Sequence, residues 1–137
     1  MNSSVFIDTS ALIALYVKND DFHFKAISYW EKAKRANYKF LISNFIFEEL
    51  TTWLCYKKNK QSAMHAGNYL LANEDILPIK PVLPEDEKEA WKLFCKLPER
   101  LSFTDCTSFA IMRRFRIKSV FTFDKHFAKA GFKIMPQ

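Results

Sequence analysis

Four acidic residues occupy positions at which a parallel α/β fold would bring them together. Asp8 and Asp124 each directly follow a short apolar run that is typical of a buried strand. Glu49 and Asp105 each stand near the start of a segment with helical spacing. Ligand sites in open parallel sheets lie beyond the carboxyl ends of the strands. We therefore expect these four side chains to share one edge of the sheet.

Helix capping is a second explanation for three of these residues. Asp8 and Asp124 each precede a predicted helix. An acidic side chain at that position can accept hydrogen bonds from the first backbone N–H groups of the helix. Ser102 and Asp105 have the spacing of a capping box. The residue types alone leave both explanations open for Asp8, Asp105 and Asp124.

Glu49 is harder to explain as a structural residue. In a helix that starts near Phe45, Glu49 falls on the apolar face, four residues from both Phe45 and Trp53. A carboxylate directed into an apolar face costs several kcal/mol unless it is paired or binds a metal. The neighbouring Glu48 falls on a more mixed face, so the helical phase favours Glu49 over Glu48 as a site residue.

Converging carboxylates without basic partners favour a divalent cation. They repel one another and raise their own pKa values, and a bound cation relieves that repulsion. Oxygen ligands from Asp and Glu suit Mg²⁺ or Mn²⁺. Such an ion activates water and stabilises charge on a phosphate. The chain also carries 21 Lys and Arg against 15 Asp and Glu, a net charge of +6, which favours a polyanionic partner such as nucleic acid.

Composition excludes several other classes of protein. The only glycines are Gly67 and Gly131, too few for a Gly-rich phosphate loop or a dinucleotide-binding turn. The three cysteines have no C-x-x-C spacing, which argues against a zinc site or a disulfide framework. No apolar stretch approaches the ~20 residues of a membrane span. The sequence therefore predicts one domain over residues 1–137, without a membrane, in the cytoplasm.

The elements that position the acidic residues alternate along the chain. Short apolar runs predict strands at residues 5–7, 40–42, 76–82, 119–123 and 132–134. Helical spacing predicts helices over residues 9–15, 22–37, 43–58, 61–72, 84–97 and 102–116, with a short helix after residue 124. This alternation predicts an α/β fold with a parallel sheet of four to five strands flanked by helices.

Four segments, in order along nearly the whole chain, resemble the PIN-domain nucleases, and especially the VapC-type toxins of toxin–antitoxin pairs. The segments are Phe6-Ile7-Asp8-Thr9-Ser10-Ala11-Leu12, Ser43-Asn44-Phe45-Ile46-Phe47-Glu48-Glu49-Leu50, Leu101-Ser102-Phe103-Thr104-Asp105-Cys106 and Thr122-Phe123-Asp124-Lys125-His126-Phe127. The resemblance implies a flavodoxin-like sheet and a metal-dependent endoribonuclease that uses Mg²⁺ or Mn²⁺ and water as the nucleophile.

The resemblance also implies roles for individual residues. The catalytic quartet would be Asp8, Glu49, Asp105 and Asp124, and the metal ligands would be Asp8, Asp105 and Asp124. Small hydroxyl residues would support them: Thr9, Ser10 and Thr122. Capping and strand-end hydrogen bonds explain those hydroxyl residues equally well.

Partners follow from the basic runs and from the resemblance. Lys57, Lys58, Arg113 and Arg114 are candidate contacts to RNA, although basic residues near helix C-termini also complement the helix dipole. The family resemblance implies a homodimer and a cognate antitoxin. Two alternatives stay open: a non-catalytic RNA-binding module, and a PIN nuclease of RNA processing that is not a toxin.

Overall fold

The computed structural model describes residues 3–137 and contains a five-stranded parallel sheet. The strands lie in the order β3-β2-β1-β4-β5. Their bounds are β1 Ser4–Ile7, β2 Lys39–Ser43, β3 Ile79–Lys80, β4 Ser119–Phe121 and β5 Lys133–Met135. The predicted α/β class and parallel sheet are therefore confirmed.

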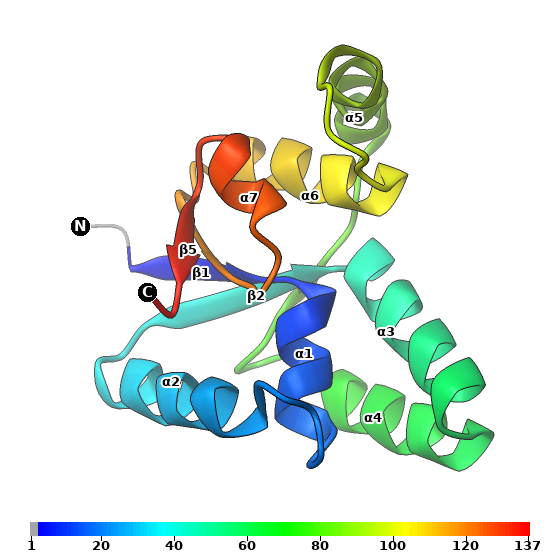
Figure 1. Cartoon of the computed structure of the whole chain (residues 1–137), viewed down its shortest axis with the longest axis vertical. Helices are drawn as coiled ribbons and strands as arrows, with labels where there is room; N and C mark the ends of the chain where they lie inside the picture. Colours follow the sequence, from blue (N-terminus) through cyan, green and yellow to red (C-terminus); the bar gives the residue numbers. More distant parts are fainter. Residues whose placement is uncertain (1–2) are drawn as a thin grey trace.

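Within residues 3–137, seven helices connect and flank the strands. They are α1 Thr9–Tyr16, α2 His23–Arg35, α3 Asn44–Lys57, α4 Lys60–Ala72, α5 Pro84–Lys96, α6 Phe103–Arg114 and α7 His126–Lys129. In Figure 1, α5, α6 and α7 lie on one side of β1 and β2, and α1 and α2 lie on the other. None of the helices in residues 3–137 is both long and apolar enough to cross a lipid bilayer.

The core is built from the central strands and the helices that cover them. Phe6 and Phe121, on the adjacent strands β1 and β4, are fully buried, as are Phe109 of α6 and Phe127 of α7. The rings of Phe109 and Phe127 meet edge to face at 5.0 Å between centroids. These buried rings fill the space between the sheet and its helices, which fixes the carboxyl ends of β1 and β4.

Strand β4 is shorter than predicted, and the reason lies in hydroxyl side chains. The backbone N–H of Phe123 donates to the Ser10 hydroxyl, and that of Asp124 donates to the Thr122 hydroxyl, both at 3.0 Å. These bonds replace the strand ladder, so β4 ends at Phe121. The prediction that Asp124 directly follows a strand was therefore wrong by two residues.

Candidate active site

Asp8 stands at the centre of the acidic cluster, directly after β1. Its backbone N–H continues the sheet by donating to the carbonyl of Phe121 at 3.0 Å, and its side chain is only 4% exposed. The carboxylate does not cap α1. Its Oδ2 instead accepts hydrogen bonds from Ser10 at 3.0 Å and Thr122 at 2.8 Å. The capping explanation is therefore wrong for Asp8.

Glu49 lies in the first two turns of α3, and its carboxylate is close enough to Asp8 for the two charges to interact. The Thr9 hydroxyl donates a short hydrogen bond to Glu49 Oε1, across 40 positions of sequence. Glu48 points elsewhere and is exposed, with its carboxylate accepting from Thr52 at 2.8 Å. The structure thus turns Glu49, and not Glu48, toward the cluster, in line with the helical phase.

Asp105 and Asp124 do cap helices, yet they also belong to the cluster. Asp105 Oδ2 accepts from the backbone N–H of Ser102 in the predicted capping box. Asp124 Oδ1 accepts from the backbone N–H of His126 and also lies 2.9 Å from the His126 ring nitrogen Nδ1. For these two residues, capping and a place in the site are compatible.

The four carboxylates share a pattern that suits a metal site. Each uses one oxygen to accept protein hydrogen bonds: Oδ2 of Asp8, Oε1 of Glu49, Oδ2 of Asp105 and Oδ1 of Asp124. Within residues 3–137, the second oxygen of Asp8, of Glu49 and of Asp124 has no protein hydrogen bond or ion pair. The protein donors orient the carboxylates, and these second oxygens are left for a ligand.

The pKa values show how these groups act on one another. Burial, together with the charges of Asp105 and Glu49, raises the pKa of Asp8 to about 7, and the Thr122 and Ser10 hydroxyls oppose the rise. Burial and the charge of Asp105 raise the pKa of Glu49. Burial and the charge of Asp124 raise that of Asp105. The four side chains from separate elements therefore form one electrostatic unit.

The donor set fits a hard divalent cation in its chemistry. All four candidate ligands are carboxylates, and no Lys or Arg in the described chain forms an ion pair with any of them. In the same residues, no three acidic, His or Cys side chains are already grouped closely enough to coordinate one ion. Each carboxylate is held by its own protein donor instead. The residue types fit Mg²⁺ or Mn²⁺, and binding requires these side chains to close around the ion.

The thiol next to Asp105 takes no part in this chemistry. Cys106 is fully buried on α6, and burial raises the pKa of its thiol to about 11, with a further contribution from the charge of Asp105. A protonated, inaccessible thiol is a poor nucleophile.

The four predicted RNA contacts lie away from the carboxylates. Lys57 and Lys58 are exposed at the far end of α3 from Glu49. Arg113, at the last turn of α6, is half-exposed and lies 3.7 Å from Glu89. Arg114 differs, because its guanidinium group is already bound within the protein.

Arg114 forms an ion pair that the sequence reasoning missed. Its Nε and a terminal nitrogen contact both carboxylate oxygens of Asp86 at 2.9–3.1 Å, and Asp86 is only 3% exposed. Asp86 shares the buried face of α5 with Ala90 and Leu93. Ala90 follows Asp86 by four residues, and Leu93 follows Ala90 by three, which is the spacing of one helical face. This pattern in the sequence could have revealed Asp86 as a buried acid that requires a partner.

Comparisons with known proteins agree with the fold. Residues 5–133 match the PIN domain family. A curated relative, the 23S rRNA-specific endonuclease VapC20 of Mycobacterium tuberculosis, is 31% identical over 129 residues, which cover 93% of this chain and 95% of the relative.

Two solved structures are also similar to this chain. The crystal structure of Mycobacterium tuberculosis VapC20, described as a sarcin–ricin loop cleaving toxin, has a TM-score of 0.83 and 29% identity, and the match covers 93% of this chain and 95% of that one. The VapBC2 complex of Rickettsia felis bound to promoter DNA has a TM-score of 0.69 at 14% identity over 96% of both chains, a likeness of fold. With the family match spanning all four acidic residues, the chain belongs to the PIN domain family and resembles its VapC toxins, as its motifs predicted.

Proposed function

We propose that this protein is a metal-dependent endoribonuclease and the toxin of a toxin–antitoxin pair. The observation that carries the proposal is the acidic cluster, in which four carboxylates from separate elements act on one another. In residues 3–137 no Lys or Arg forms an ion pair with them, and the one basic side chain paired with the cluster is His126, at Asp124. Holding Asp8 buried in such a cluster is costly for the fold. A catalytic metal site would explain why the fold keeps this unfavourable arrangement of charges.

Asp8, Asp105 and Asp124 would hold Mg²⁺ or Mn²⁺, with Glu49 completing the site directly or through water. When bound, the ion supplies an activated water and neutralises negative charge on the phosphate. The protein's own contribution is orientation. Ser10 and Thr122 fix one oxygen of Asp8, and Thr9 fixes one oxygen of Glu49.

The first substrate to test is the sarcin–ricin loop of 23S rRNA. VapC20, which is described as acting there, is 31% identical to this chain over most of its length. Among the basic residues, we retain Lys57, Lys58 and Arg113 as candidate RNA contacts. Arg114 is left out, because its guanidinium group is bound to Asp86.

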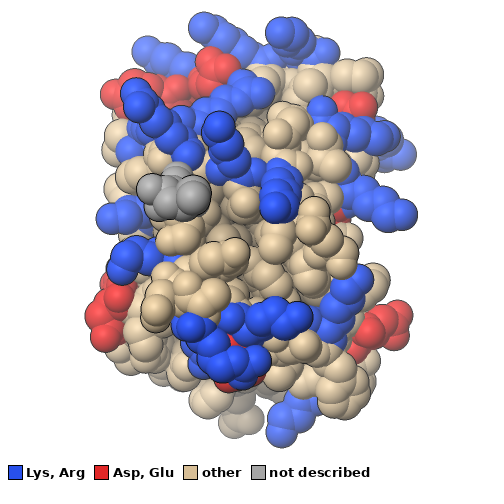
Figure 2. Space-filling model, turned by 90° about the vertical axis from the view of Figure 1, so that its left-hand side faces the viewer, with Lys and Arg blue, Asp and Glu red and all other residues tan. Residues whose placement is uncertain are grey.

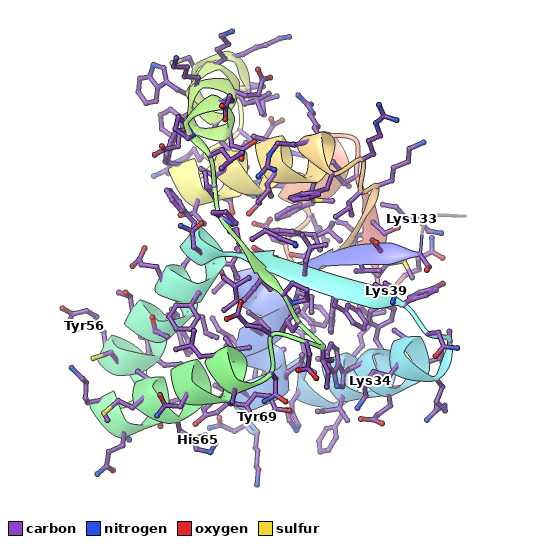
Figure 3. The ribbon with its side chains drawn as sticks, turned by 180° about the vertical axis from the view of Figure 1, so that it is seen from behind. Lys34, Lys39, Tyr56, His65, Tyr69 and Lys133 are labelled. Atoms are coloured by element: carbon purple, nitrogen blue, oxygen red, sulfur yellow. The ribbon has the colours of Figure 1, made fainter. Side chains whose placement is uncertain are left out.

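An apolar pocket supports a protein partner. A cavity of about 300 Å³ lies between α1, α2 and α4, and its lining includes Tyr16, Trp30, His65 and Tyr69. Figure 3 shows His65 and Tyr69 on α4, the helix that borders this cavity. An apolar segment of an antitoxin would cover it. Residues 1–137 would thus act as one domain in the cytoplasm, inhibited by the antitoxin and paired as a homodimer.

The decisive experiment incubates the purified chain with an RNA hairpin of the sarcin–ricin loop and with unstructured RNA. Each reaction contains Mg²⁺, Mn²⁺ or EDTA, and the Asp8→Asn variant is assayed beside the wild type. We expect cleavage of RNA that requires both the metal and Asp8.

Other outcomes separate the alternatives. Salt-sensitive RNA binding without metal-dependent cleavage would indicate a non-catalytic RNA-binding module. Cleavage in cells that leaves growth unaffected, with no inhibitor protein needed, would indicate a processing nuclease and not a toxin.

A further inference from the structure

The basic residues of this protein are concentrated at the amino ends of three strands. Residues 31–39, 113–119 and 128–133 lead into β2, β4 and β5, and we call these three connections the basic edge. The basic edge carries ten of the 21 Lys and Arg residues and one of the 15 Asp and Glu residues. The whole chain has a net charge of +6, so all residues outside the basic edge are together net negative.

The sheet register places three lysines of the basic edge close together. Lys39 pairs with Ser4 of β1, and Lys133 pairs with Ser119, the residue after Lys118. Because neighbouring strands are about 4.8 Å apart, the backbone of Lys118 lies roughly 5 Å from that of Lys133 and roughly 10 Å from that of Lys39. Lys39 and Lys133, three strand spacings apart, are separated by roughly 14 Å. All three are exposed, and no carboxylate in residues 3–137 forms an ion pair with them.

The figures show the result as one cationic face. Figure 2 shows that Lys and Arg side chains spread over the face on the left of Figure 1, whereas Asp and Glu gather toward its margins. Figure 3 shows Lys39 and Lys133 at the same end of the sheet, with Lys34 of α2 below them. The concentration seen in the sequence is therefore also a concentration in space.

Helix dipoles explain only part of this face. Lys34, Arg113 and Arg114 stand in the last turns of α2 and α6, where cations are favourable, and each has an acidic partner. Lys39 and Lys118 lie beyond those last turns, where the dipole effect has faded. The three lysines place like charges in one row with no carboxylate paired to them in the described chain, an arrangement that favours binding of an external anion.

We propose that the basic edge binds the sugar–phosphate backbone of folded RNA at a distance from the cleaved bond. The inference rests on the proposed ribonuclease function. The carboxylates lie at the opposite end of the strands, and along α6 alone Asp105 and Arg113 are about 12 Å apart. A short strand at the carboxylates does not extend to the basic edge, whereas a folded RNA can contact both. The basic edge thus favours large, structured RNA as substrate.

The test compares two triple variants with equal charge changes, both in an Asp8→Asn background that prevents cleavage. One variant changes Lys39, Lys118 and Lys133 to Gln. The control changes Lys88, Lys92 and Lys96 to Gln, three exposed lysines on α5 with no ion pair in the described chain. Binding is measured to a folded ribosomal RNA fragment that contains the sarcin–ricin loop, and to a short single-stranded RNA, at several salt concentrations.

We expect the basic-edge variant to bind the folded fragment at least about tenfold more weakly at low salt, and its log–log salt slope to fall by about 2–3. The loss should be smaller for the short RNA and for the α5 control. Equal losses in the two triple variants would overturn the inference, because only net charge would then matter. Unchanged affinity for the folded fragment would also overturn the inference. The basic edge would then be a candidate surface for binding a protein or DNA. Absence of cleavage by the wild type would overturn the proposed function, while the binding comparison would still decide this inference.

Discussion

The hydroxyl group of Thr122 lies 2.8 Å from a carboxylate oxygen of Asp8, although 114 positions separate the two residues in the sequence. The bond joins the end of β1 to the segment after β4, where Asp124 follows. It also opposes the rise in the pKa of Asp8 that burial causes. One hydroxyl group therefore positions the central carboxylate and keeps it closer to its ionised form.

Replacing Thr122 with Val should weaken the site without unfolding it. Without the hydroxyl, the pKa of Asp8 rises further above about 7, so the ionised form that binds metal appears only at higher pH. We expect about 10- to 100-fold weaker apparent metal affinity at pH 7 and an alkaline shift of the pH–rate profile. Thr107→Val is the matched control, since that buried hydroxyl donates only to a carbonyl of its own helix. An unshifted pH profile in Thr122→Val would contradict the proposed role.

Asp8→Asn should stabilise the folded protein at pH 8. The pKa of Asp8 is about 7 in the folded state and 3.8 ordinarily, so the folded state binds more protons between these values. Stability from this group is therefore present at low pH and lost as the pH rises through about 7. Thermal unfolding without metal should show a gain on the order of 1–4 kcal/mol at pH 8, shrinking as the pH falls toward 4.

Asp86→Asn serves as a control of opposite sign. Asp86 is as deeply buried as Asp8, but it is paired with Arg114. Removing its charge leaves that partner unneutralised and should cost about 1–3 kcal/mol, since Arg114 is partly exposed. If both variants shift stability in the same direction, the cost assigned to the buried charge of Asp8 is wrong.

Much of the candidate site follows from local sequence patterns. The features that could not be predicted are those that depend on packing between elements. Glu49 could be placed because helical phase alone directs it toward the apolar face of α3. The end of β4 could not be placed, because it depends on hydroxyl groups of Ser10 and Thr122 that meet only in the folded chain. Arg114 looked like a free surface cation because its partner Asp86 is supplied by the packing of α5 against α6.

Glu49→Gln should reduce RNA cleavage far more than Glu48→Gln. Glu49 is oriented by Thr9 and shares the electrostatic unit with Asp105, whereas Glu48 is exposed and bonded to Thr52. We expect the rate of cleavage to fall by at least about 10- to 100-fold for Glu49→Gln and by less than about twofold for Glu48→Gln. Single-turnover cleavage at saturating metal measures both, and the reverse order would show that Glu48 is the site residue.

Mg²⁺ or Mn²⁺ should raise the unfolding temperature of the wild type, because the ion neutralises carboxylates that repel one another. An ion at 100 times its dissociation constant stabilises the folded state by about 2.7 kcal/mol, which is several degrees for a chain of this size. The rise should disappear with EDTA and be strongly reduced in Asp8→Asn, yet persist in Glu48→Gln. Matching the ionic strength with NaCl separates ion binding from general screening. An equal rise in Asp8→Asn and the wild type would place the bound ion outside the acidic cluster.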